Sequence, residues 1–128
     1  MCNEIAREFF LTQNKSCSEA VFLTACKTFN LNAGEETIKA VGAFSGGCGC
    51  ERICGAAAGA LCAIGIKYNT GEAHDSLEMR GKCAAFLKEF MAFYGSDLCK
   101  VIKPLHRKEN VRCLSVVEAT LDILEKYM

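Results

Sequence analysis

The sequence predicts an all-α protein: a single-domain helical bundle of about five to six helices around a buried Gly/Ala-rich central helix. Three observations support this prediction. Apolar residues recur at helical spacing along the chain, whereas no segment alternates apolar and polar residues for long, as a half-buried strand would. Residues 53–66 are apolar nearly all round, which is typical of a buried helix. With 128 residues and no linker or repeat, residues 1–128 are expected to form one domain with its own core.

Three helices are expected before the glycine-rich turn. The first lies at the N-terminus, where apolar residues have helical spacing. Ser16 and Glu19 have the spacing of a capping box and predict the start of a second helix, which ends near Asn30. Glu35 opens a third helix, because an acidic residue interacts favourably with the positive end of the helix dipole. This helix ends at Gly46.

The remaining helices follow that turn. The central helix is expected over residues 52–68, where glycines and alanines let neighbouring helices approach closely. A long helix is expected over residues 72–94. A short helical turn through Cys99 should break at Pro104, the only proline, and a last helix is expected over residues 110–127. The Gly/Ala surface of the central helix can pack within one subunit or across a dimer axis, and we expect a homodimer.

Composition and charge exclude several classes of function. Lys plus Arg and Asp plus Glu number 15 each, so the chain lacks the basic excess with which nucleic-acid-binding proteins neutralise phosphates. The N-terminus lacks the uninterrupted apolar run of a signal peptide. The longest uncharged apolar run, residues 53–66, is shorter than the roughly 20 residues that span a bilayer. We therefore expect a cytoplasmic protein that is not membrane-embedded and binds no nucleic acid.

The ten cysteines indicate metal or redox chemistry, because a reducing compartment gives them no role as structural disulfides. Free cysteines also serve as small buried hydrophobes, and this explanation covers several of the ten. The densest group is Cys48, Cys50 and Cys54, in the stretch SGGCGCERICG. Its C-x-C-x3-C spacing is neither that of a zinc finger nor that of a bacterial ferredoxin.

The surroundings of these cysteines strengthen the case for a site. Gly47, Gly49 and Gly55 allow backbone shapes that bring amide groups close to a bound anionic cofactor. Cys54 is expected in the first turn of the central helix, where the helix dipole stabilises a thiolate. A phosphate-binding loop is disfavoured because the stretch lacks G-K-[ST]. The remaining alternative is a plain glycine turn with cysteines as filler.

Four cysteines give the chain a resemblance to a known family. Cys17, the C-G-A-x-x-G stretch that begins at Cys54, Cys99 and Cys113 match, in order, the pattern of the C_GCAxxG_C_C family of redox-active proteins. The resemblance extends from Asn14 to the final helix. It implies an α-helical protein in which these four cysteines form one redox or metal site. A related domain occurs in split-Soret-type cytochromes, where it is associated with an iron–sulfur centre.

The resemblance leaves several points open. Cys48 and Cys50 depart from the family pattern, so they could add metal ligands, supply a resolving thiol or do nothing. His106, which lies between the last two family cysteines, is a further candidate ligand. The absence of C-x-x-C-H argues against covalent haem.

Three functions follow, and the sequence does not decide whether the protein is an enzyme. In the first, the four family cysteines bind an iron–sulfur cluster and exchange electrons with an unknown redox partner protein. In the second, the protein is a metal-free thiol–disulfide redox protein in which Cys54 attacks and Cys99 or Cys113 resolves. In the third, zinc holds a structural or cysteine-rich interaction module.

Overall fold

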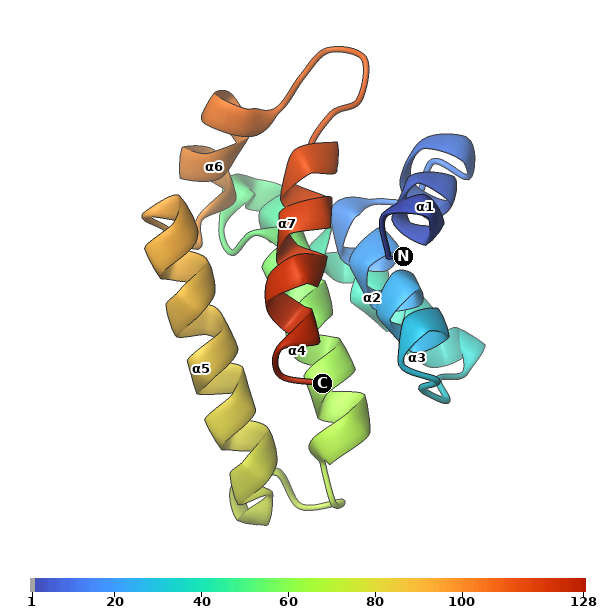
Figure 1. Cartoon of the computed structure of the whole chain (residues 1–128), viewed down its shortest axis with the longest axis vertical. Helices are drawn as coiled ribbons and strands as arrows, with labels where there is room; N and C mark the ends of the chain where they lie inside the picture. The colour runs from blue at the N-terminus through green and yellow to red at the C-terminus, as the bar shows by residue number, and fades with distance from the viewer. Residues whose placement is uncertain (1) are drawn as a thin grey trace.

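The computed structural model describes residues 2–128, which form seven α-helices, with short turns of 3-10 or π helix in some of the connections between them (Figure 1). The α-helices are α1 (Cys2–Arg7), α2 (Cys17–Thr28), α3 (Glu35–Val41), α4 (Gly55–Tyr68), α5 (Leu77–Tyr94), α6 (Cys99–His106) and α7 (Leu114–Glu125). The short turns are η1 (Glu8–Thr12), η2 (Gly42–Phe44), η3 (Gly47–Glu51) and η4 (Ala73–Asp75). The predicted all-α class is confirmed, with seven helices rather than five or six.

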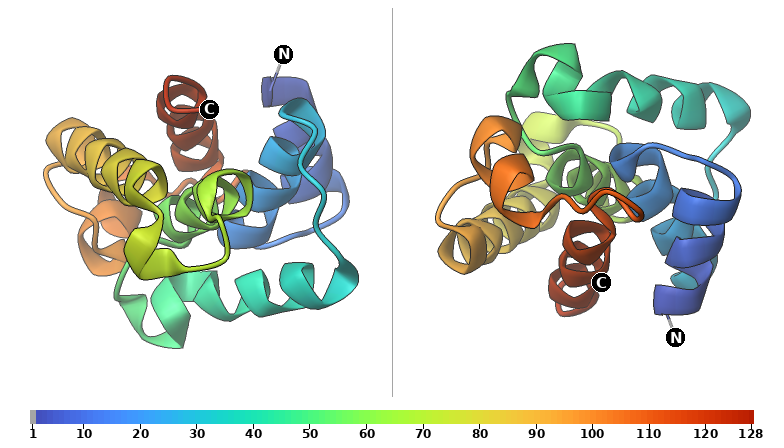
Figure 2. Two further views of the ribbon diagram at one scale, coloured as in Figure 1. Left: turned by 90° about the horizontal axis from the view of Figure 1, so that it is seen from below. Right: turned by 90° about the horizontal axis from the view of Figure 1, so that it is seen from above.

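Helix α4 occupies the centre of the bundle, as the sequence predicts. It packs against α2, α5 and α7, and the views of Figure 2, from below and from above, show it enclosed by the other helices. Most of its residues are buried, including Gly55, Gly59 and the alanines between them. A Cβ at Gly59 would clash with the Ser18 carbonyl oxygen and would lie 3.2 Å from the Ser18 Cα. Glycine is therefore what allows the backbones of α2 and α4 to touch.

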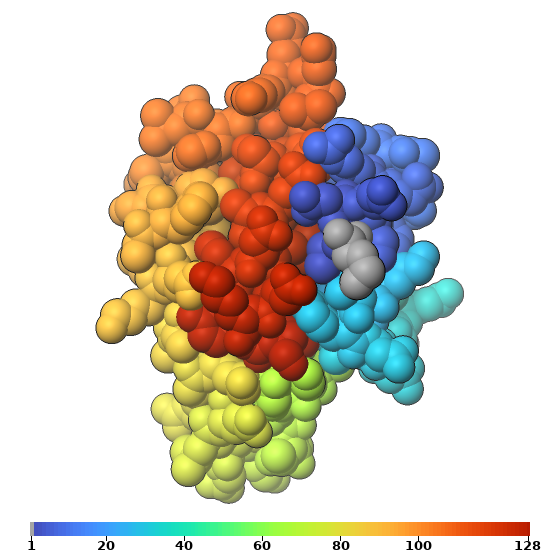
Figure 3. Space-filling view, viewed as in Figure 1, coloured from blue at the N-terminus to red at the C-terminus, as the bar shows by residue number. Residues whose placement is uncertain are grey.

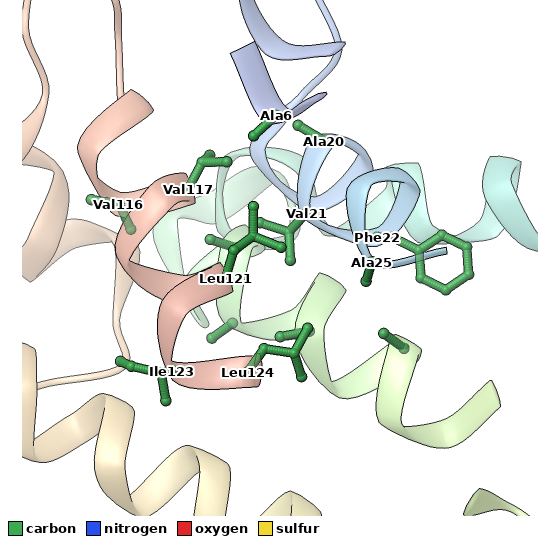
Figure 4. Close-up of a cluster of buried hydrophobic side chains, with 14 of the residues drawn as sticks. Ala6, Ala20, Val21, Phe22, Ala25, Val116, Val117, Leu121, Ile123 and Leu124 are labelled. Carbon is green, nitrogen blue, oxygen red and sulfur yellow. The ribbon is translucent and has the colours of Figure 1, made fainter. Parts of the chain in front are cut away.

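The hydrophobic core fills the space between α2, α4 and α7. Val21 on α2 and Leu121 on α7 are fully buried and point toward each other, and Leu124, further along α7, is also fully buried (Figure 4). In the space-filling view, α7 lies between α5 and the N-terminal helices, and the loop that precedes α7 projects at the top (Figure 3). The start of α4 is buried, and it lies at the same end of the molecule as α6.

The predicted capping box at the start of α2 is confirmed. The Glu19 amide donates to the Ser16 Oγ at 3.3 Å, and the Ser16 amide donates to the Glu19 carboxylate at 3.1 Å. Since N-cap Ser→Ala changes typically cost about 1 kcal/mol, we expect Ser16→Ala to lower the free energy of unfolding by about that amount. Urea unfolding would measure it. Ser115→Ala, at an exposed position in the first turn of α7, is the control and should change stability by less than about 0.5 kcal/mol.

Three predicted helix starts were wrong. The long helix α5 begins at Leu77 rather than near residue 72, because the separate 3-10 turn η4 occupies residues 73–75. The last helix begins at Leu114 rather than near residue 110, because Lys108 and Arg112 exchange two backbone hydrogen bonds of 2.9 and 2.7 Å and Arg112 has a φ of 52°. The central helix begins at Gly55 rather than at residue 52. As a result, Cys113 and Cys54 stand at the N-cap positions of α7 and α4.

The predicted break at Pro104 was also wrong. Helix α6 continues through this residue to His106, and the Arg107 amide closes the helix by donating to the Lys103 carbonyl oxygen at 2.9 Å. Lys103 and Arg107 thus lie one helical turn apart. None of the helices in residues 2–128 is long and apolar enough to cross a membrane. The homodimer stays a prediction.

Candidate functional site

The four cysteines of the family pattern lie at the N-termini of four different helices. Cys17 is the first residue of α2 and Cys99 the first of α6, while Cys54 and Cys113 are the N-cap residues of α4 and α7. All four line one cavity of about 30 Å³, together with Gly55, Ile102, Lys103 and Val116. The right-hand view of Figure 2 looks onto this end of the molecule, where α6 and the loop to α7 lie over the beginning of α4.

A network of backbone hydrogen bonds joins the glycine-rich loop to the start of α6. The Cys99 amide donates to the Arg52 carbonyl oxygen, and the Cys54 amide donates to the Asp97 carbonyl oxygen, each at 2.6 Å. The Arg52 amide in turn donates to the Gly47 carbonyl oxygen at 2.8 Å. These bonds hold the two segments that carry Cys54 and Cys99 against each other.

Two of the three glycines singled out in the sequence permit close contacts at this junction. Gly47 has a φ of 66°, and a Cβ there would lie 2.7 Å from the Cys99 Cβ. A Cβ at Gly55 would lie 2.6 Å from the Cys17 sulfur and 2.9 Å from the Phe44 carbonyl oxygen. Gly49 differs, because a Cβ at this position would meet nothing within 4 Å. Gly47 and Gly55 therefore bring the cysteines together, whereas Gly49 serves the turn through its φ of 76°.

Cys48 and Cys50 are not brought to the cavity. Both side chains are exposed, and neither lines the space that the four family cysteines surround. Cys48 has a φ of 62°, and the Cys50 thiol lies 3.8 Å from the Gly47 carbonyl oxygen. In this arrangement the two residues form the outer surface of the loop. Of the other cysteines, Cys26, Cys62 and Cys83 pack against the core as expected.

Burial dominates the acid–base behaviour of the site. It raises the pKa of Cys54 to about 12, and the sulfurs of Cys17 and Cys99 add to the increase. The amides of Ala56 and Ala57, at the start of α4, lower the pKa of Cys54 but do not offset burial. Burial likewise raises the pKa of Cys17, Cys99 and Cys113. Without a bound cation, Cys54 is therefore a neutral thiol. The helix start does favour the thiolate, as predicted, but burial outweighs this effect.

A second cavity, of about 230 Å³, opens beside the first, and we call it the vestibule. Its lining residues are Phe10, Ser16, Cys17, Gly46, Cys99, Lys103, Arg107, Arg112 and Cys113. Burial and the Cys99 sulfur raise the pKa of Cys113, while Arg107, Lys103 and Arg112 lower it. All three cations therefore lie close enough to act on this sulfur.

The sequence alone does not single out these cations. Arg112 could pair with a thiolate, but a position on a solvated helix face is the preferred interpretation, and neither Lys103 nor Arg107 stands out. Two features of the sequence could have indicated them. Lys103 and Arg107 are four residues apart, which places them on one side of a helix, and Arg112 is next to Cys113.

Two aromatic side chains complete the surroundings. Burial raises the pKa of Tyr94 to about 12, and Cys54 and Cys113 contribute, so the phenol lies near these two sulfurs. The Tyr94 ring packs edge-on against His106, with centroids 5.0 Å apart. His106 lines neither the 30 Å³ cavity nor the vestibule, so the structure does not place it as a ligand beside the four cysteines.

The arrangement of the sulfurs limits what they can bind without moving. In the described part of the chain, no group of three or more His, Cys, Asp or Glu side chains is arranged to hold a metal ion. Within residues 2–128, the side chains of ligand type that line the small cavity are the four thiols, with no carboxylate or imidazole among them. This donor set is soft, and it suits iron–sulfur clusters or zinc rather than oxygen-preferring cations.

Comparison with known proteins places the chain in a family. The family model described as "Putative redox-active protein (C_GCAxxG_C_C)" matches residues 15–127, nearly the whole chain. This range contains all four cysteines that surround the cavity. No curated protein and no solved structure matches the chain. The chain therefore belongs to the C_GCAxxG_C_C family of redox-active proteins.

Proposed function

We propose that Cys17, Cys54, Cys99 and Cys113 hold an iron–sulfur cluster and that the protein transfers electrons. The observation that carries this proposal is the meeting of four cysteines, each at a helix N-terminus, around one cavity. A helix N-terminus carries about half a positive charge on its free amides. Four such ends favour thiolates and an anionic cluster far more than one end would.

The burial of the thiols supports a bound metal. Cys54 is only 6% exposed, and its raised pKa means that the free side chain is a neutral thiol at neutral pH. A coordinating metal ion deprotonates a thiol outright and compensates the charge that burial disfavours. The site is thus suited to thiolates that a metal neutralises.

The four thiols are not arranged around one point, and the cavity of about 30 Å³ between them has room for only a water molecule or two, so the sulfurs must shift to bind either cofactor. Zinc requires four sulfurs within about 2.3 Å of one point. Iron–sulfur clusters place inorganic sulfide and several irons between the thiolates, so they join sulfurs that lie farther apart. Because the family is one of redox-active proteins and zinc has no redox chemistry, we prefer the cluster to zinc, which remains the alternative cofactor.

When bound, such a cluster supplies one-electron transfer. The chain contributes its environment. Ile102 and Val116 are buried apolar walls that limit access of water to the sulfurs. Lys103, Arg107 and Arg112 place positive charge beside Cys113, which favours the more negative, reduced state and raises the reduction potential. The electron would pass to a redox partner protein.

A metal-free dithiol function is the second candidate, and one observation weighs against it. Attack on a disulfide requires a thiolate, and burial raises the pKa of Cys54, Cys99 and Cys113 alike. The site therefore disfavours the nucleophile that this function needs at neutral pH.

Iron, sulfide and zinc analysis with a visible spectrum, on protein purified without oxygen, tests the proposal. We expect stoichiometric iron and sulfide in the wild type and the loss of most of both in Cys54→Ser, because one thiolate ligand is removed. Cys50→Ser is the matched control, since this exposed cysteine lies outside the cavity, and it should keep its iron. A colourless protein with stoichiometric zinc would instead support the structural module. Metal-free thiols that oxidise in pairs would support the dithiol function.

A further inference from the structure

We propose that the vestibule is a binding site for a small anion, of the carboxylate or phosphate-like oxyanion class, which lies against the sulfurs of Cys99 and Cys113. This inference goes beyond electron transfer, because the residues that would bind the anion do not depend on a bound cluster. Three observations carry it: a concentration of unpaired cations, an arginine held in place by several contacts, and a cavity of matching size.

The vestibule collects positive charge that carboxylates do not neutralise. Lys103 lies in the last turn of α6 and Arg107 is the C-cap residue of this helix, whereas Arg112 comes from the loop that precedes α7. Among residues 2–128 the salt bridges join Arg7 to Glu118 and Lys126 to Glu89, so they leave these three cations unpaired. No carboxylate of the described chain lines the vestibule. In a chain with zero net charge, this local excess favours an anionic ligand.

Arg112 is held firmly in the vestibule wall. Its guanidinium donates a hydrogen bond to the Phe10 carbonyl oxygen and lies 4.1 Å from the centroid of the Phe10 ring. Its backbone has a φ of 52° and is held by the two hydrogen bonds to Lys108. Left-handed backbone at a non-glycine residue is costly, and such residues cluster at functional sites. Arginine has five N–H donors, so the bond to Phe10 leaves donors for an oxyanion.

The size of the vestibule selects a small ligand. A volume of about 230 Å³ corresponds to about eight water molecules in the liquid. It admits a phosphate or a short di- or tricarboxylate, and it is smaller than the roughly 300–1,000 Å³ of pockets for drug-sized ligands. Because Cys17, Cys99 and Cys113 form part of the lining, a bound anion contacts the same residues that surround the small cavity.

Isothermal titration calorimetry with inorganic phosphate and with malonate, at constant ionic strength on anaerobically purified protein, tests the proposal. We expect saturable binding of at least one of them to the wild type. Lys103→Gln/Arg107→Gln should weaken it at least about tenfold, because each lost charge-assisted hydrogen bond accounts for roughly that factor. Lys88→Gln/Lys100→Gln is the matched control: it removes the same charge from exposed positions outside the vestibule and should bind as the wild type does.

Three results would overturn the proposal. The first is the absence of saturable binding of both anions. The second is equal weakening in the two double variants, which would show a general charge effect. The third is that neither small anion binds, while a polyglutamate peptide binds in a way that depends on Lys103 and Arg107. This result would make the surface a protein-docking site. Circular dichroism checks that both variants fold, and iron analysis of the same samples tests the cluster separately.

Discussion

When the pH is raised from about 9 to about 12, the free energy of unfolding of the metal-free protein is expected to fall by about 4 kcal/mol because of Cys54 alone. Burial raises the pKa of this thiol from 9.0 to about 12 in the folded state. Between these values the unfolded chain has released the proton and the folded chain has kept it, so stability falls as pH rises. The stabilisation is complete below pH 9 and lost by about pH 12. Each pKa unit corresponds to about 1.4 kcal/mol.

The experimentally accessible part of this titration lies between pH 8.5 and 10, where most lysines still keep their protons. There the expected loss of unfolding free energy is about 1.2 kcal/mol, measurable by urea unfolding of reduced protein in the presence of a chelator. Cys54→Ala should lack this part of the pH dependence, and Cys50→Ala, at an exposed position, should retain it. The same pH dependence in wild type and Cys54→Ala would contradict the buried neutral thiol. Reconstitution of the cluster should remove the dependence, because bound thiolates carry no proton.

The second large effect is expected from Gly59→Ala, which should lower the free energy of unfolding by about 3 kcal/mol or more. A methyl group at this position meets the backbone of Ser18 on α2 rather than a flexible side chain. The two helices would have to separate, and the separation would disturb the core between α2, α4 and α7. The Ser18 hydroxyl, which donates to the Val41 carbonyl oxygen at 3.0 Å, would move with α2.

Gly65→Ala is the matched control on the same helix. A Cβ at Gly65 meets nothing within 4 Å, so the substitution should stabilise the protein by about 0.4–1 kcal/mol through the lower entropy of the unfolded chain. Urea midpoints of the two variants should therefore shift in opposite directions. Equal stability of Gly59→Ala and the wild type would show that the backbones of α2 and α4 do not touch.

The helical class, the central position of residues 55–68 and the capping box at Ser16 were all predictable from the sequence. They depend on local signals: the spacing of apolar residues, the near absence of charge in one segment, and a serine three residues before a glutamate. The close-packing role of Gly55 and Gly59 followed from the same pattern. The family pattern singles out Cys17, Cys54, Cys99 and Cys113, because the order and spacing of these cysteines are properties of the sequence alone, and the structure shows that they line one cavity. That they bind a cofactor stays a prediction.

Helix boundaries near the site were less predictable. Pro104 predicts a break, yet α6 passes through it. The loop before α7 is set by the paired backbone bonds of Lys108 and Arg112, which no periodicity reveals. These boundaries matter, because they place Cys54 and Cys113 at N-caps and place Lys103 and Arg107 among the residues that line the vestibule.

Only the tertiary structure decided which groups meet and in what charge state. It placed four helix N-termini around one cavity, left Cys48 and Cys50 on the surface, and gathered three cations beside Cys113. It also reversed the expected pKa shift of Cys54, because the helix dipole is a local effect, whereas burial comes from segments far apart in the chain. The sequence thus determined which thiols are candidates for the site. Their burial, and the thiols and cations that lie next to them, depend on contacts that only the folded chain makes.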